Sequence, residues 1–552
     1  MKTLVLALVL SVSSLMATTV ERDCSKLDAP MVESLQGIVI LGSWDHVRNQ
    51  PVTDCDCVIA EDVLLLERHP KFLQKLYDTY IGKALTQKAI WNLKNEITDF
   101  YRSQNQPFVV VSIPKQELTK CMLQVVVKEA VLGEVYSSGN CYFPTRWLAE
   151  EMSTNPGDPI DTKVVYEDIA WLNLNPFRRT DAIFKPGEKP GTTDIELVTI
   201  DRWPYRMYVG ADNTGTIPTN RNRLFFGFNF GKSILKDGQI SYQFTFAPNW
   251  NRFFSHAVSA RLPLPWRNIF VLWGGYSEVE PDTGISNMKN HGKSWQVDVR
   301  YQVPLFLSSN VMQTVVLGYD FKETNNNLLF DGNDIFKANA DINQFMVGYE
   351  FGYATKSLNV IWNTEVYASP GEITYADKNR LYDRFRAGAK NQYAYIKMVH
   401  QVGLTTNSGI FSCNLNGQLA SANLLPSEQI TVTGYNAVRG FEERVLNLDN
   451  GLIVNLTYET PHVSFAKWMG KCEHVDEFYL LAFFDCGFGR DHLIESEAQR
   501  MQSLGSIGPG ARYQVGRYVS ARFDYGIQLW NRPPPNTPNL SLIHISEPTR
   551  PY

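Results

Sequence analysis

Two short segments in the last quarter of the chain carry residues of opposite charge that could form a reversible contact. Val438-Arg439-Gly440-Phe441 lies in a long polar loop, and Phe483-Phe484-Asp485-Cys486-Gly487 lies on a strand of alternating residues. If Phe484 and Cys486 face outward, Asp485 faces inward. An arginine and a carboxylate can form a bidentate, charge-assisted pair. The pattern predicts a latch between loop residues Val438, Arg439, Gly440 and Phe441 and wall residues Phe483, Asp485 and Gly487.

The residue types that catalysis would need are sparse. The 9 histidines are scattered, and Gly505-Ser506-Ile507-Gly508 lacks the pattern of a nucleophile elbow. There is no glycine-rich phosphate loop with its lysine. Cys55-Asp56-Cys57 resembles half of a metal site, but no His or Cys pair at suitable spacing completes it. We therefore expect a protein that is not an enzyme and has no metal or cofactor, and the net charge of -5 gives no reason to expect nucleic acid.

The elements that must position the latch are strands. Between residues 204 and 539 we count about fifteen segments of alternating apolar and polar residues, as in a transmembrane β-barrel. A soluble sandwich would also have one apolar face, but the apolar faces here are large and aromatic. An apolar face toward lipid and a polar face toward a wet lumen explain the pattern better. No apolar run after the N-terminus reaches the roughly 18 residues that a membrane helix needs.

The predicted fold class is mainly β: a sixteen-stranded antiparallel transmembrane β-barrel preceded by two α+β domains. Such barrels have even strand numbers, so one strand is expected to be lost after Pro533-Pro534-Pro535. Residues 540–552 resemble translated read-through of a sequencing adapter, and we expect this artefact to take no part in the fold. Two unpaired strand edges in lipid are costly, so the chain as written is expected to insert poorly until a native C-terminus is restored.

The N-terminal part reads as an export signal followed by a repeat. Residues 1–17 have a positive end, an apolar stretch and small residues, as a signal peptide does, and residues 18–35 form a linker. Residues 36–130 and 131–201 then share a β-α-α-β-β plan. Five cysteines precede the barrel, and in an exported protein disulfides are a more typical use for them than metal sites. These five are Cys24, Cys55, Cys57, Cys121 and Cys141.

Five motifs in order resemble two-partner secretion transporters (TpsB, the ShlB/FhaC/HecB haemolysin secretion/activation family). This family belongs to the superfamily that includes BamA-type assembly proteins. The motifs are Tyr80-Ile81-Gly82-Lys83-Ala84-Leu85-Thr86, Leu172-Asn173-Leu174-Asn175-Pro176-Phe177-Arg178, Asp212-Asn213-Thr214-Gly215-Thr216, Leu425-Pro426-Ser427-Glu428-Gln429 with Val438-Arg439-Gly440-Phe441, and Phe483-Phe484-Asp485-Cys486-Gly487. The resemblance covers about residues 36–539, and single motifs of this kind are weak.

The resemblance implies an outer-membrane transporter of a Gram-negative-type (diderm) bacterium. Residues 36–130 and 131–201 would be periplasmic POTRA domains 1 and 2, which capture an unfolded, TpsA-like exoprotein in extended form. The barrel would export it without ATP, and its sixth loop would fold into the lumen with Arg439 near Asp485. The barrel would contact outer-membrane lipid and be inserted by the barrel-assembly machinery.

Three questions stay open at this point. Val125, Val127, Ile195 and Leu197 are candidates for exposed POTRA edges that accept a cargo strand, or they belong to core strands. Arg439 and Asp485 either gate the pore or only stabilise the barrel. The main alternative function is a barrel-assembly factor of the same superfamily, although two POTRA units is the secretion-type number. A passive porin would need neither the repeat nor the latch.

Overall fold

The computed structural model describes residues 28–48, 57–232, 237–308, 310–330, 333–470, 476–493, 501–516, 518–532 and 540–546. The predicted signal peptide lies outside these residues. The chain divides into two compact units, one of residues 1–138, 145–165 and 182–198, the other of residues 139–144, 166–181 and 199–552. Within the described ranges, no helix has the length and hydropathy needed to cross a membrane.

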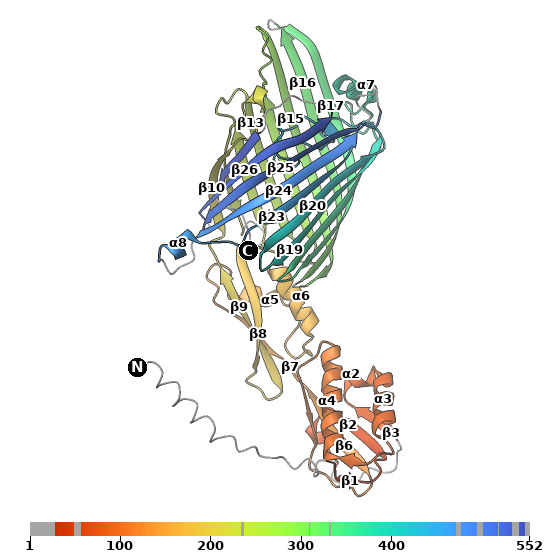
Figure 1. The fold of residues 1–552 in the computed structure, drawn as a ribbon. Coiled ribbons are helices and arrows are strands. Elements are labelled where there is room, and N and C mark those ends of the chain that lie inside the picture. The colour runs from red at the N-terminus through yellow and green to blue at the C-terminus, as the bar shows by residue number, and fades with distance from the viewer. Residues whose placement is uncertain are drawn as a thin grey trace, which may run out of the picture. The chain divides into compact units, whose positions relative to one another are not determined.

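The first α+β domain is built on a four-stranded sheet in the order β3-β2-β6-β5 (Figure 1). Its long helix α4 is capped at its N-terminus by Thr86, whose side chain accepts a hydrogen bond from the Ala89 N–H. Burial raises the pKa of Tyr101 at the end of α4, and its hydrogen bond to Glu129 raises it further. The elements are β1 Pro30–Val32, β2 Gly37–Leu41, η2 Trp44–His46, β3 Cys57–Glu61, α2 Leu64–Glu67, α3 Pro70–Tyr80, β4 Leu85–Thr86, α4 Gln87–Ser103, β5 Val109–Ser112 and β6 Met122–Glu129.

This domain begins earlier than residue 36. Strand β1 pairs with β4, and Leu35 is buried in the core with Leu85. The last part of the expected linker, residues 18–35, is therefore a strand and a core residue, because Val32 and Leu35 supply apolar side chains that the helices cover. Cys57 is disulfide-bonded, whereas Cys121 and Cys141 are free thiols, so the disulfide expectation is wrong for those two.

The second α+β domain has a three-stranded sheet in the order β7-β9-β8. Its strands and helices follow the predicted β-α-α-β-β plan. They are β7 Val131–Ser138, α5 Thr145–Glu150, α6 Thr162–Leu172, β8 Arg178–Pro186 and β9 Thr192–Asp201.

The expectation that the candidate cargo-binding residues lie on exposed edge strands is wrong. Val125 and Val127 lie on β6, which has β2 on one side and β5 on the other. Ile195 and Leu197 lie on β9, the middle strand of its sheet. All four side chains are buried. An apolar run does not show by itself whether a strand is central or at an edge, and in the first domain the edge strands β3 and β5 differ from β6 by being less buried.

The C-terminal part is a closed antiparallel barrel of sixteen strands (Figure 1). The strands, in barrel order, are β10 Tyr205–Asp212, β11 Arg223–Phe230, β12 Gln239–Phe246, β13 Phe253–Pro263, β14 Ile269–Val279, β15 Met288–Leu307, β16 Val311–Phe330, β17 Asn333–Ala354, β18 Leu358–Ser369, β19 Tyr393–Thr406, β20 Gly409–Ala420, β23 Asn450–Glu459, β24 Asp476–Arg490, β25 Gln502–Val515, β26 Val519–Arg532 and β27 Leu540–Ser546. The connections contain η3 Ile217–Thr219, α7 Asn379–Phe385, β21 Ile430–Thr431, β22 Asn447–Leu448 and α8 Phe465–Trp468.

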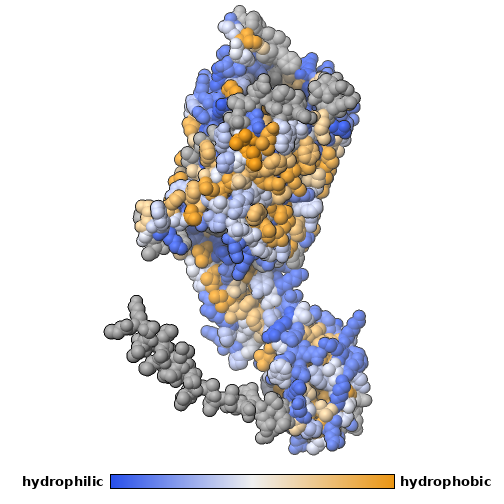
Figure 2. Space-filling view, in the orientation of Figure 1, coloured by the Kyte–Doolittle hydropathy of each residue, from blue (hydrophilic) through white to orange (hydrophobic). Residues whose placement is uncertain are grey.

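The outer surface of the barrel is apolar, as the alternation predicts. On β26, Val519, Phe523, Tyr525, Ile527 and Leu529 are exposed, whereas Asp524 between them is buried. Figure 2 shows apolar residues gathered over the barrel strands. A large apolar patch on an exposed sheet is the face that such a barrel turns to lipid.

The expectation that the sixteenth strand is missing is wrong. Leu540–Ser546 forms β27, which pairs with β26 over seven residues and with β10 over three, and so closes the barrel. The reason is that a strand edge offers unpaired backbone N–H and C=O groups, which almost any extended segment can satisfy. The side-chain pattern of residues 540–552 was a poor guide because backbone pairing does not depend on it.

Candidate functional site: loop 6 and the barrel wall

Loop 6, residues 421–449 between β20 and β23, folds back against the inside of the barrel. Its short strands β21 and β22 pair through Ile430 with Leu448 and Thr431 with Asn447. An apolar cluster joins the loop to Ile453 of β23 and Leu504 of β25. The loop residues in it are Ile430, Val432, Ala437, Val438, Phe441 and Leu448. Burial of these side chains stabilises the loop against the wall independently of any ion pair.

The Arg439 guanidinium binds Asp485 as a fork. Nε lies 2.7 Å from Oδ2 and Nη2 lies 2.9 Å from Oδ1. The Arg439 backbone N–H also donates to Oδ2, at 3.1 Å. Asp485 is 0% exposed and lies on the inward face of β24, between the outward positions Phe484 and Cys486. The contact expected from the two motifs is therefore present, with ideal bidentate geometry.

The same site holds a second acid–base pair that the motifs did not indicate. Asp524 on β26 lies 3.6 Å from Arg439 Nη1 and accepts two hydrogen bonds from Arg512 on β25, at 3.0 and 2.9 Å. Two arginines thus face two aspartates, and the cluster is electrically balanced. The Arg439 guanidinium also lies 3.7 Å from the centre of the Phe483 ring, a cation–π contact. The alternation of β26 gave the one available signal for Asp524, because it lies on the polar face.

Glycines let the loop approach the wall closely. Gly440 has a φ of +89°, in the left-handed region that favours glycine, and its C=O accepts a hydrogen bond from Gln528 at 2.8 Å. A Cβ on Gly440 would lie 2.9 Å from the Cα of Gly526 on β26. Gly487 leaves room for Val438, whose Cγ2 would lie 3.0 Å from an added Cβ. Backbone packs on backbone here, which fixes where the arginine can reach.

The base of loop 6 is tied to neighbouring loops by further ion pairs. Asp449 is buried and accepts from both terminal nitrogens of Arg386, at 2.6 and 2.9 Å. Asp449 also accepts from the backbone N–H of Leu424, at 3.0 Å. Glu442 forms an ion pair with Arg221, in the first loop of the barrel. In the part of the chain that the structure describes, no group of His, Cys, Asp and Glu side chains is arranged to hold a metal ion.

Comparison of the sequence with known protein families identifies the family of this chain. Residues 191–506, more than half of the chain, match the family described as haemolysin secretion/activation protein ShlB/FhaC/HecB. Residues 66–130 match the ShlB-type POTRA domain. The chain belongs to the ShlB/FhaC/HecB family. As the sequence motifs predicted, it is a two-partner secretion transporter with periplasmic POTRA domains and an outer-membrane barrel that exports a partner exoprotein.

Curated relatives of this transporter are distant in sequence but match most of their length. The heme/hemopexin transporter protein HuxB of Haemophilus influenzae (strain 86-028NP) is 20% identical over 81% of this chain and 79% of HuxB. The outer membrane transporter CdiB of Escherichia coli O6:K15:H31 is 20% identical over 68% of this chain and 64% of its own.

Solved structures agree on the fold. CdiB from Escherichia coli superimposes with a TM-score of 0.76 and 15% identity, covering 96% of this chain and 93% of CdiB. BamA from Haemophilus ducreyi lacking POTRA domains 1–3 gives a TM-score of 0.50 and 10% identity, covering 86% of this chain and 96% of that one. The family match to haemolysin secretion/activation proteins favours secretion over the barrel-assembly alternative.

Proposed function

We propose that the Arg439–Asp485 contact is a releasable latch, which holds loop 6 inside the barrel until the exoprotein passes. The observation that carries this proposal is the bidentate pair between a loop and a buried wall carboxylate. A charge-assisted hydrogen bond contributes about 1.5–3 kcal/mol. Such a contact is strong enough to order a loop, yet a cargo segment that makes comparable contacts can replace it.

We further propose that the POTRA domains capture the cargo as an added strand. The sheet of the first domain has two edge strands, β3 and β5. We propose β5 for cargo, because its Val110 is 62% exposed and its far side has no partner strand among the described residues. A chain segment that pairs with β5 gains main-chain hydrogen bonds without strict sequence demands. Export is then driven by binding differences and by folding outside the cell, without ATP.

The barrel surface supports lipid as a partner, and membership of the family is the reason to propose the barrel-assembly machinery. Exposed apolar residues such as Met207 and Val209 on β10 would contact outer-membrane lipid, and the barrel would be inserted by the barrel-assembly machinery. We propose a transporter that is not an enzyme, because the polar residues at the loop 6 site are paired with one another and none is placed as a nucleophile beside a base.

Removing either partner of the latch tests this function. Arg439→Ala and Asp485→Asn are each expected to abolish exoprotein secretion while leaving barrel insertion largely intact, because the Arg439 segment loses its fixed place on the wall but the strands keep their pairing. Secretion into the medium and heat-modifiable migration of the barrel are the two measurements. Arg444→Ala is the matched control, since Arg444 is an exposed arginine of the same loop, and it is expected to secrete normally.

Secretion and heat-modifiable migration together distinguish a gating role of the latch from a role in barrel stability. If both latch variants fail to insert into the outer membrane, Arg439 and Asp485 stabilise or assemble the barrel and the gating role is wrong. If both insert and secrete at the wild-type level, the latch has no part in transport.

A further inference from the structure

Loop 6 is divided between two parts of the barrel wall. Residues from Ile430 to Leu448 pack on β23 and β25, next to the Arg439 site. The preceding residues Ala422, Leu424 and Leu425 belong to a different apolar cluster, with side chains of β16, β17, β18 and β19. In barrel order β16 is the seventh strand and β26, which carries Asp524, is the fifteenth. The loop therefore crosses the lumen between nearly opposite walls.

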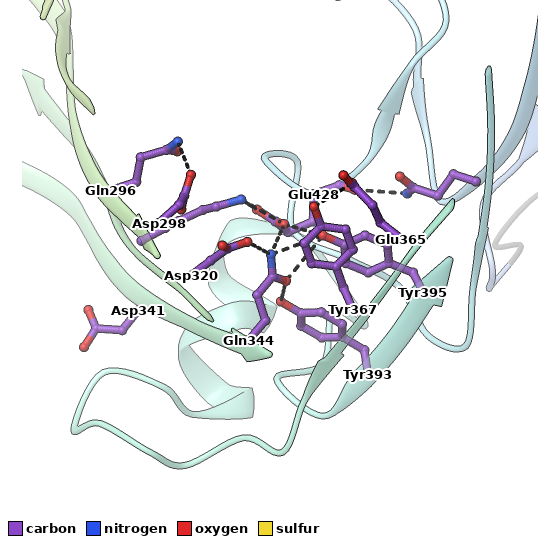
Figure 3. Close-up of polar contacts among 12 residues, drawn as sticks. Gln296, Asp298, Asp320, Asp341, Gln344, Glu365, Tyr367, Tyr393, Tyr395 and Glu428 are labelled. Atoms are coloured by element: carbon purple, nitrogen blue, oxygen red, sulfur yellow. Dashed lines mark hydrogen bonds and ion pairs between the residues drawn. The ribbon is translucent and has the colours of Figure 1, made fainter. Parts of the chain in front are cut away.

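Glu428 is the polar centre of the first half of the loop. Its carboxylate is 0% exposed and accepts from Lys322 Nζ at 2.8 Å and 3.1 Å. Tyr395 Oη donates to it at 2.8 Å and Gln344 Nε2 at 3.0 Å. Its backbone C=O accepts from Gln418 at 3.0 Å. Residues of three different strands thus hold the Glu428 carboxylate, as Figure 3 shows for Gln344 and Tyr395, and a residue of a fourth strand holds its backbone C=O.

The wall residues around Glu428 also form hydrogen bonds and an ion pair among themselves. Gln344 Nε2 also donates to Asp320 at 2.9 Å, and Tyr393 donates to Gln344 Oε1 at 3.0 Å (Figure 3). Asp320 forms an ion pair with Arg300 on the adjacent strand. The carboxylates of Asp320 and Asp298 also attract the Lys322 ammonium group electrostatically. The wall network is therefore held together without Glu428, and Lys322 would keep anionic neighbours if the loop withdrew.

We propose that Glu428 is a second latch residue, which fixes the start of loop 6 to β16, β17 and β19. It rests on the proposed function of the Arg439 latch, and it adds that loop 6 clears the lumen only when both contacts are released. Glu428 is a positioning residue, because it acts on the pore through the loop and not through the cargo. Two separate contacts on opposite walls make the closed state more stable than either contact alone.

Glu428→Gln tests the second latch with little change in shape. Glutamine still accepts a hydrogen bond from Tyr395, but the ion pair with Lys322 is lost. The full-length transporter in planar lipid bilayers is expected to spend about tenfold more time open, the effect of one weakened charge-assisted contact. Cells are expected to become sensitive to vancomycin, which is too large for ordinary porins. Glu278→Gln is the matched control, since Glu278 pairs with Lys293 on the neighbouring strand, at 2.8 Å, away from loop 6.

Double variants distinguish one contact from two. Glu428→Gln with Lys322→Met is expected to open the pore no more than the stronger single variant, because both changes remove the same contact. Glu428→Gln with Arg439→Ala is expected to multiply the two single effects on the open fraction, because the contacts are independent. If the Glu428–Arg439 combination opens the pore no more than Arg439→Ala alone, there is a single latch and the proposal is wrong.

Failure of this proposal can be told apart from failure of the proposed function. If Arg439→Ala opens the pore and Glu428→Gln leaves the conductance at the wild-type level, only the second latch is wrong. A lower temperature of heat-modifiable unfolding for Glu428→Gln, with unchanged conductance, would assign Glu428 to wall stability and overturn the proposal in the same way. If Arg439→Ala has wild-type conductance and secretion, the Arg439 latch itself fails.

Discussion

At the scale of residues, the loop 6 site depends on how closely two backbones approach as much as on charge. Arg439 reaches Asp485 because Gly440 lies directly on Gly526. A buried ion pair also carries a desolvation cost, and removing one partner leaves the other charge unpaired. The site offsets that cost by matching Arg439 and Arg512 with Asp485 and Asp524. Small residues and balanced charge together place the loop.

A methyl group at position 526 tests the close approach. Gly526→Ala places a Cβ under 3.0 Å from the Gly440 backbone, so the loop must move off the wall, at a cost of about 1–3 kcal/mol for overpacking. We expect more frequent pore opening in bilayer recordings. Gly403→Ala on β19 is the control, because the nearest atom to its Cβ would be 3.9 Å away. Identical recordings from both variants would show that the contact does not position the loop.

At the scale of elements, the POTRA strands show which parts are core and which are available for binding. Strand β6 is paired on both sides, and its Val125 lies in the hydrophobic core with Ile40 and Leu93. Strand β5 is paired with β6 through Val109 to Ser112 and presents its other edge. A cargo strand can be added only where backbone groups are free, so β5 replaces β6 as the candidate edge.

Two valine substitutions, one on each strand, test whether β6 is core and β5 is an edge. Val125→Ala removes buried methyl groups, and we expect it to lower the free energy of unfolding of the first domain by about 2 kcal/mol. Val110→Ala changes an exposed side chain and should stay within about 0.5 kcal/mol. Hydrogen exchange of the β2 and β6 amides in the full-length transporter measures both. Equal exchange rates in the two variants would contradict the assignment of β6 to the core.

At the scale of the whole molecule, the barrel closes where its first strand, β10, pairs with its last strand, β27. This seam has fewer paired residues than any other strand pair of the barrel. Strand β10 pairs with β27 over three residues, Gly210 to Asp212, whereas it pairs with β11 over eight. His544 of β27 also lies 3.4 Å from Asp212, which adds an acid–base contact at this seam. Few hydrogen bonds hold this seam, so the stability of the barrel depends on a strand whose sequence did not predict it.

Removing that strand is expected to prevent closure. Deletion of residues 540–552 leaves the edges of β10 and β26 unpaired in lipid, where unsatisfied backbone groups cost several kcal/mol each. We expect the heat-modifiable form to disappear in gel electrophoresis. Deletion of residues 547–552 alone keeps β27 and should preserve that form. Equal amounts of the heat-modifiable form after both deletions would show that β27 is not needed for closure.

The sequence by itself indicated two α+β domains before a barrel, about fifteen barrel strands and the inward direction of Asp485. Alternation with period two fixes the side of the wall on which each side chain lies. It also indicated that Arg439 and Asp485 meet, through motifs read by resemblance. Strand order in a sheet depends on long-range backbone pairing, so only the tertiary structure decided that Val125 and Ile195 are interior. The same reason explains why Leu540–Ser546 closes the barrel. It also explains why Glu428, which the sequence offered as part of a loop motif but with no partner, lies buried against Lys322 on the far wall.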